Sequence, residues 1–153
     1  FDAGRFDIVV TRLSFHHFAE PIRPFAEMTR VLKRGGKLVI IDMEATDEAL
    51  RTTEDEIETI RDASHVKNMS GDEFACLYER FGYELIRRES TPIPVDLQAW
   101  MNLTNTSEER QRTIIGLMRK ELAGGPKTGF YPYLKDGAMM FNQRWLLMLG
   151  IRR

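Results

Sequence analysis

Two short apolar runs near the start of the chain flank one amphipathic segment. Residues 6–10 and 37–42 are rich in β-branched side chains and contain neither proline nor glycine, a pattern typical of strands buried on both faces of a parallel sheet. Between them, Pro21 and Pro24 open a segment whose apolar side chains recur three or four positions apart, as on one helix face. These side chains are Phe25, Met28, Val31 and Leu32. Because a helix between parallel strands crosses over in the right-handed sense, we expect the two strands to be neighbours, or nearly so, in one sheet.

The middle of the chain predicts two further helices and a strand. An acidic segment from about Asp47 to Ala63 carries apolar residues at helical spacing, and residues 70–73 form a capping-box motif that starts the next helix. Residues 83–89 are predicted to form a strand, and their mixed patterning places it near a sheet edge. Pro92 and Pro94 are expected to break the chain after this strand.

The last third of the chain predicts a helical pair followed by a hairpin. Asp96 is expected to cap the first helix, and Thr106 with Glu109 to form a second capping box. Residues 136–137 (Asp-Gly) are a favoured tight-turn pair, and residues 138–151 alternate well enough to form the second arm of the hairpin. Parallel strands first and a hairpin arm last predict an α/β fold, an open sheet with an antiparallel strand at its end.

Composition narrows the class of protein. With 153 residues, of which 42% are hydrophobic and 29% charged, the chain is long enough for one core and is typical of an ordinary soluble domain. A net charge of -1 gives no reason to expect a nucleic-acid partner. The one cysteine, Cys76, excludes an internal disulfide, fits a reducing, cytoplasmic location and is predicted to fill a core position. No apolar stretch reaches the roughly 18 residues that a membrane span requires.

Three parts of the chain carry a family resemblance. The first comprises residues 6–10, 15–18, 27–36 and 38–42. The second comprises residues 61–66, and the third comprises residues 141–147. Together they resemble the class I S-adenosylmethionine-dependent methyltransferases, especially bacterial quinone and small-molecule methyltransferases of the methyltransferase domain 11 type. The resemblance implies a Rossmann-like fold in which this chain supplies strands four, five, six and seven with flanking helices. It also implies that residues 91–137 form a helical and loop insertion before the antiparallel last strand.

The chain also departs from the family pattern. Family members begin with a strand that ends in a glycine-rich turn, and they place an acidic residue at the end of strand two to hold the ribose of the cofactor. This sequence has neither feature, and its glycines at 35–36, 71 and 124–125 follow or open helices instead. We therefore expect residues 1–153 to be a single partial domain, the carboxy-terminal half of a methyltransferase without strands one to three.

His16 and His17 form the first candidate site, because they follow the carboxyl end of a predicted parallel strand, where open α/β sheets bind ligands. The resemblance implies that this loop runs along S-adenosylmethionine, with Thr11, Arg12 and Leu13 facing the methionine part and both histidines close to the cofactor. His17 is the candidate catalytic base, since imidazole accepts protons near neutral pH. The alternative is that the pair only shapes the loop and caps the next helix. A metal is not expected, because no further ligand follows at suitable spacing.

Arg61, Asp62 and His65 form the second candidate cluster. Because they follow the predicted acidic helix, we expect them to close over the methyl acceptor, with His65 as a second catalytic candidate. Residues 61–66 are similar to a loop of one subgroup of the family, just before the helix that leads to strand six. The alternative is a loop held by an Arg-Asp pair and a cap from Ser64.

Three functions from different classes remain open. The first is S-adenosylmethionine-dependent methyl transfer to a small-molecule acceptor by the full-length protein, with this chain inactive alone. The second is a non-catalytic module that forms homo-oligomers, such as a dimer, through the exposed edge of the strand at residues 6–10. The third is an NAD-dependent Rossmann enzyme, which predicts a dinucleotide-binding motif upstream.

Overall fold

The computed structural model describes residues 1–45 and 47–153, and these residues form two compact units. Unit one comprises residues 1–45, 67–91 and 145–153, and unit two comprises the described residues within 47–66 and 92–144. Each unit has a hydrophobic core of its own. Both units are therefore assembled from segments that lie far apart in the sequence.

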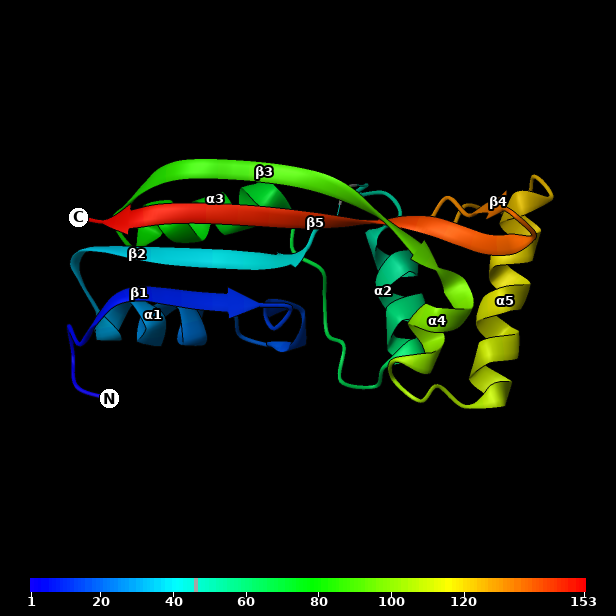
Figure 1. Cartoon of the computed structure of the whole chain (residues 1–153), viewed down its shortest axis with the longest axis horizontal. Coiled ribbons are helices and arrows are strands. Elements are labelled where there is room, and N and C mark those ends of the chain that lie inside the picture. The colour runs from blue at the N-terminus through cyan, green and yellow to red at the C-terminus, as the bar shows by residue number, and fades with distance from the viewer. Residues whose placement is uncertain (46) are drawn as a thin grey trace. The chain divides into compact units, whose positions relative to one another are not determined.

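Unit one begins with the predicted strand, helix and strand (Figure 1). β1 (Phe6–Arg12) and β2 (Leu32–Met43) pair in parallel, and α1 (Ile22–Val31) connects them. The register sets Val9 opposite Leu38. The prediction of neighbouring parallel strands is confirmed, and β2 begins directly after α1, before the expected start of the strand.

Among the described residues, five strands form one sheet in the order β1-β2-β5-β3, with β4 paired to β5. β3 spans Tyr83–Asp96, β4 spans Tyr133–Lys135 and β5 spans Ala138–Arg152. β5 runs antiparallel to β2, with Lys37 opposite Ile151 and Met43 opposite Trp145. The predicted fold class, a mixed α/β sheet with an antiparallel last strand, is confirmed.

One face of the unit-one sheet packs against α1 and α3 (Gly71–Arg80), which lie on the same side of the strands in Figure 1. Phe25 of α1 and Tyr78 of α3 are buried and meet edge to face, with ring centroids 5.3 Å apart. On β1, by contrast, Ile8 is 56% exposed and Val10 is 60% exposed. The prediction that this strand is buried on both faces is wrong, because β1 is an edge strand of the described sheet.

Unit two contains α2 (Arg51–Arg61), which begins later than the predicted start at Asp47, together with α4 (Leu97–Asn102), α5 (Glu108–Leu122) and the β4-β5 hairpin. Its core includes three aromatic rings, whose centroids lie between 5.1 and 5.6 Å apart. These rings belong to Trp100, Phe130 and Phe141. The predicted hairpin turn is confirmed at residues 136–137, where φ is 51° at the aspartate and 80° at the glycine, as two-residue hairpin loops require.

β3 extends farther than the sequence predicts. The prediction that Pro92 and Pro94 break the chain is wrong, since the strand continues through both prolines to Asp96. The expected edge position is confirmed, because β3 ends the described strand order opposite to β1. An edge strand accommodates proline, which has no backbone N–H, without losing a ladder hydrogen bond.

Two local predictions fail at the level of single side chains. α5 is capped by Ser107 and not by Thr106. Thr106 is buried, and its hydroxyl donates instead to the backbone carbonyl of Arg61 at 3.1 Å. Cys76, which was expected in the core, is exposed on α3. In both cases the predicted helix is present. The capping residue differs in the first case, and the direction of the Cys76 side chain differs in the second.

Candidate functional site

A buried aspartate organises the carboxyl ends of the two parallel strands. Asp42 lies near the end of β2 and is 1% exposed. Its Oδ2 accepts hydrogen bonds from the amides of Ser14 at 2.8 Å and Phe15 at 2.7 Å, and its Oδ1 accepts one from the amide of Met43 at 2.9 Å. A carboxylate is stable in the interior when donors surround it in this way. Asp42 therefore fixes the loop after β1 to the end of β2.

The same loop is also held by its backbone and by one aromatic ring. Leu13 has a positive φ of 50°, and its amide donates to the carbonyl of Ile41 at 2.8 Å. Phe15 opens a short 3-10 helix, η1 (Phe15–His17), and its buried ring packs edge to face against Phe74 in the core of unit one. These anchors set the positions of the two histidines that follow.

His16 and His17 occupy different environments. His16 is 5% exposed, and its Nδ1 lies 2.6 Å from Oδ1 of Asp42. Because an ionised carboxylate only accepts hydrogen bonds, the proton in this contact belongs to Nδ1. His17 is half-buried, and its ring centroid lies 4.0 Å from that of His16. The pair therefore consists of an inner histidine held by Asp42 and a more accessible outer histidine.

The predicted cofactor residues Thr11, Arg12 and Leu13 are contiguous with this loop. Thr11 is buried in β1 opposite Ile40. The guanidinium of Arg12 lies 4.8 Å from the centre of the Trp145 ring, a cation-π contact. The structure thus brings every residue predicted on the cofactor side to one edge of unit one.

The sequence resemblance implies S-adenosylmethionine as the cofactor, with its methionine end at this edge. The sulfonium and ammonium groups of that end are cationic. Asp42 adds a buried carboxylate behind the loop. Residues 11–13 and the two histidines are the residues that the resemblance assigns to this end. Within the described part of the chain, we assign no residue to the ribose or the adenine.

Asp42 and Trp145 are the site residues that the sequence analysis did not single out. Asp42 carried a signal, since an acidic side chain at the end of an apolar strand needs several donors if it is buried. Trp145 carried none, because its place beside Arg12 depends on the strand order β1-β2-β5.

In unit two, Arg61 and Asp62 line a depression of about 460 Å³ together with residues 104–107. The guanidinium of Arg61 is 10% exposed and contacts the buried carboxylate of Glu58 at 3.1 Å. It also lies 4.5 Å from the centre of the Trp100 ring. Arg61 is therefore engaged within the protein, and its ion pair is with Glu58.

The imidazole of His65 lies apart from that depression. Its side chain has no exposed surface, and Nε2 lies 2.8 Å from Oδ1 of Asp55 on α2. His65 is not among the described residues that line the depression. Asp62 accepts hydrogen bonds from the amide and the hydroxyl of Ser64, at 2.9 and 2.6 Å. The structure brings Arg61 and Asp62 to one surface and encloses His65 elsewhere in the same unit.

The described residues offer neither a metal centre nor a membrane-spanning helix. In residues 1–45 and 47–153, no three side chains from His, Cys, Asp and Glu gather closely enough to hold a metal ion. Every helix in the same ranges is too short or too polar to cross a membrane.

Known proteins similar to this chain include methyltransferases. Residues 1–40 match the sequence family described as "Methyltransferase domain". The uncharacterized methyltransferase YcgJ of Bacillus subtilis (strain 168) is 30% identical to this chain over 118 residues, which cover 75% of this chain and 46% of YcgJ. The crystal structure of YcgJ aligns with a TM-score of 0.81 at 24% identity, covering 100% of this chain and 66% of that chain.

Two further solved structures share the fold. The BH2331 protein of Bacillus halodurans C-125 aligns with a TM-score of 0.87 at 25% identity, covering 99% of this chain and 66% of that chain. A Haemonchus contortus phospholethanolamine N-methyltransferase 2, in complex with phosphomonomethylethanolamine and S-adenosylhomocysteine, aligns with a TM-score of 0.53 at 15% identity, covering 99% of this chain and 35% of that chain. This chain spans about half the length of the curated relatives that it matches.

Proposed function

We propose that the full-length protein transfers a methyl group from S-adenosylmethionine to a small-molecule acceptor. The premise is that this chain belongs to the class I S-adenosylmethionine-dependent methyltransferases. The observation that carries the proposal is the set of hydrogen bonds to Asp42. It fixes a loop with two histidines at the sheet edge where open α/β folds bind ligands. Because the chain spans about half the length of its relatives, we assign the activity to the full-length protein and not to residues 1–153 alone.

S-adenosylmethionine is the proposed cofactor. When bound, it supplies an electrophilic methyl group on a sulfonium centre. The residues proposed to line its methionine end are Thr11, Arg12, Leu13, His16 and His17. The Haemonchus contortus neighbour supports this choice, since that protein is in complex with S-adenosylhomocysteine, the demethylated form of the cofactor.

His17 is the proposed general base. Methyl transfer mainly requires alignment of the two reactants and exclusion of water, and a base contributes when the acceptor must also lose a proton. His17 is the more accessible ring of the pair. His16 is proposed as a positioning residue, because Asp42 holds its Nδ1 and its ring contacts that of His17 at 4.0 Å between centroids.

The acceptor side is proposed at the depression that Arg61 and Asp62 line. Asp62 supplies a carboxylate there, and Arg61 holds the loop through its contact with Glu58. The predicted acceptor-binding role of Arg61 and the predicted catalytic role of His65 stay predictions. The guanidinium of Arg61 is engaged with Glu58, and the side chain of His65 is enclosed. A cytoplasmic location is also proposed, supported by the single, exposed Cys76.

Calorimetry with S-adenosylmethionine tests the cofactor assignment. We expect the protein encoded by the full reading frame to bind it in the micromolar range, and the 153-residue chain to show no such binding. In the full protein, Asp42→Asn should weaken binding at least tenfold, because the loop amides lose an acceptor. Asp72→Asn, a change to an exposed carboxylate on α3, is the matched control and should leave the affinity unchanged. No binding by the full protein would overturn the proposed function. Micromolar binding to residues 1–153 alone would overturn the expectation that this chain does not bind the cofactor by itself.

A kinetic measurement tests the role of His17. With catechol as an oxygen-acceptor probe, His17→Asn should lower kcat roughly 10²-fold or more. Arg23→Gln changes an exposed side chain on α1 and should keep the wild-type kcat. An unchanged kcat in His17→Asn would exclude His17 as the base.

A second candidate function, self-association, is favoured by the exposure of β1. In the described sheet, β1 pairs with β2 alone, and Ile8 and Val10 are 56% and 60% exposed. An apolar edge strand of this kind is a template for pairing with another chain. Sedimentation of the 153-residue chain should therefore show a concentration-dependent dimer that Val10→Lys dissociates. A monomer at high concentration would exclude this function.

A further inference from the structure

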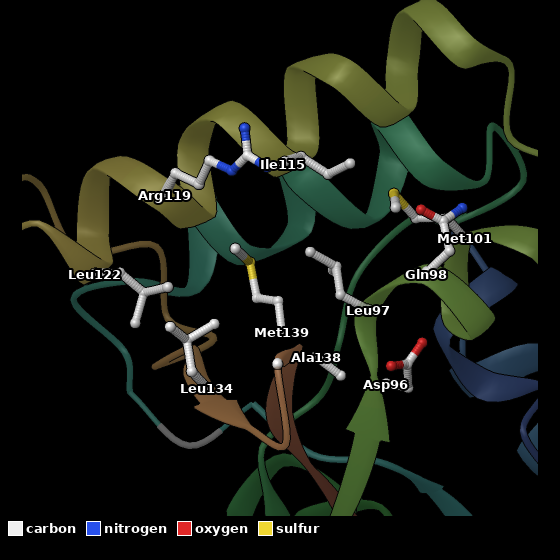
Figure 2. Close-up of a pocket in the computed structure, with 11 residues that line it drawn as sticks. Asp96, Leu97, Gln98, Met101, Ile115, Arg119, Leu122, Leu134, Ala138 and Met139 are labelled. Atoms are coloured by element: carbon white, nitrogen blue, oxygen red, sulfur yellow. The ribbon is translucent and has the colours of Figure 1, made fainter.

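Unit two contains a second, largely apolar pocket of about 410 Å³ that lies outside the proposed cofactor and acceptor sites. Its walls come from α4, α5 and the β4-β5 hairpin, and Figure 2 shows Leu97, Leu134 and Met139 pointing into it. A volume of this size is within the range of small-molecule sites, which are typically lined by apolar side chains with a few polar groups. The pocket therefore has the dimensions and the lining of a ligand site.

One cation lies on the wall of this pocket. Arg119 of α5 lines it, and within the described residues no carboxylate is within ion-pair distance of the Arg119 guanidinium. Arg112, about two turns away on the same helix, differs because it contacts Glu108 at 3.6 Å. A guanidinium beside apolar surface and without an internal anion is suited to bind a carboxylate through two parallel hydrogen bonds.

The opposite end of the pocket carries the other sign of charge. Asp96 lines that end, where its Oδ1 caps α4 by accepting from the amide of Ala99 at 2.7 Å. In Figure 2 the Asp96 carboxylate and the Arg119 guanidinium lie on different sides of the apolar side chains. An anionic head group is therefore repelled from one end and attracted to the other, which gives a bound molecule a single orientation.

We propose that this pocket binds an elongated apolar carboxylate of the medium-chain fatty acid class, with its carboxylate on Arg119 and its hydrocarbon chain along Leu97, Leu134 and Met139. Burial of the chain supplies affinity that is proportional to its apolar area, and the guanidinium selects the charge of the head group. The inference stands apart from methyl transfer, since it concerns binding to unit two and requires no cofactor.

Equilibrium dialysis of labelled decanoate against the 153-residue chain, below the micelle concentration of decanoate, tests the proposal. We expect saturable binding of one decanoate per chain. Arg119→Gln should weaken that binding at least tenfold. Decanol has the same hydrocarbon chain without the charge. Its affinity for wild type should therefore be about as low as the affinity of decanoate for Arg119→Gln. Arg112→Gln is the matched control on the same exposed helix and should bind decanoate like wild type.

A second variant tests the position of the hydrocarbon chain. Leu134 is 66% exposed, so Leu134→Glu should leave the fold intact while placing a negative charge beside the apolar path. Circular dichroism and the melting temperature check the folded state of each variant, and Leu134→Glu should weaken decanoate binding at least tenfold. Equal affinity of wild type and Arg119→Gln would overturn the proposal. So would the absence of saturable decanoate binding.

Discussion

Asp42 is the single residue on which the geometry of the loop after β1 depends most. Its two oxygens accept hydrogen bonds from three backbone amides and contact the Nδ1 of His16. Asp42→Asn replaces one acceptor oxygen with a donor, so at least one buried donor loses its partner and faces an N–H instead. Each such loss typically destabilises a protein by about 1–3 kcal/mol. We therefore expect Asp42→Asn to lower the free energy of unfolding by roughly 3 kcal/mol in urea titrations.

An exposed aspartate provides the control for this prediction. Asp72 is paired with Arg88, but its side chain is 87% exposed, so Asp72→Asn should change the free energy of unfolding by less than about 0.5 kcal/mol. Amide exchange adds a local readout, since the amides of Ser14 and Phe15 should lose protection in Asp42→Asn and keep it in Asp72→Asn. Retained protection in Asp42→Asn would show that the loop is held by other contacts.

Single residues also mark where sequence reasoning succeeds. The caps at Ser70 and Asp96 are confirmed, because a cap and its target amide lie within three positions of each other. The Asp42 contacts join residues that are 26 to 28 positions apart, so local patterning does not reveal them. Thr106 fails as a cap for a related reason, because its hydroxyl has a distant partner in the carbonyl of Arg61.

At the scale of elements, the two serine caps allow a comparison. Ser70 Oγ accepts from the amide of Glu73 at 3.2 Å, and the Glu73 carboxylate accepts from the amide of Ser70 at 2.7 Å, which completes the capping box of α3. Ser107 accepts from the amide of Arg110 at 3.5 Å. We expect Ser70→Ala to destabilise the protein by about 1 kcal/mol and Ser107→Ala by less, measured by urea unfolding. The reverse order would contradict the assignment of the box to α3.

The residue pattern of a strand predicts the strand itself but not whether it lies at the centre or the edge of the sheet. The runs at 6–10 and 37–42 predict strands because β-branched residues fit an extended backbone. Exposure of Ile8 and Val10 follows from the edge position of β1, which is a property of the whole sheet. Pro92 and Pro94 illustrate the same point. Prolines end a central strand, but an edge strand such as β3 accommodates them.

At the scale of the whole molecule, the last strand completes the core of unit one. β5 lies between β2 and β3 in the strand order, so the carboxy-terminal residues separate two strands that precede them in the sequence. Tyr78 of α3 joins this arrangement, since its hydroxyl lies 3.2 Å from the carbonyls of both Leu38 and Met148. The hydrophobic pattern of β5 predicts a strand, but its central position depends on which strands it pairs with.

Two buried tyrosines make the stability of the whole molecule sensitive to alkaline pH. Burial, and then the proximity of Tyr83, raises the pKa of Tyr78 far above its ordinary value near 10, and burial also raises the pKa of Tyr83. Well below pH 10 both hydroxyls are protonated in the folded and unfolded states. Above pH 10 the unfolded chain releases these protons and the folded chain retains them, so the free energy of unfolding must fall as pH rises.

We expect that fall to approach about 1.4 kcal/mol per pH unit for each tyrosine that keeps its proton in the folded state. Urea unfolding at intervals between roughly pH 9 and 11 measures it. Tyr78→Phe removes one of the two groups and should make the decline shallower, because phenylalanine releases no proton in either state. Tyr133→Phe, which changes a half-exposed side chain of the hairpin, should keep the wild-type decline. If Tyr78→Phe declined as steeply as wild type, the hydroxyl between Leu38 and Met148 would not be the source of the pH dependence.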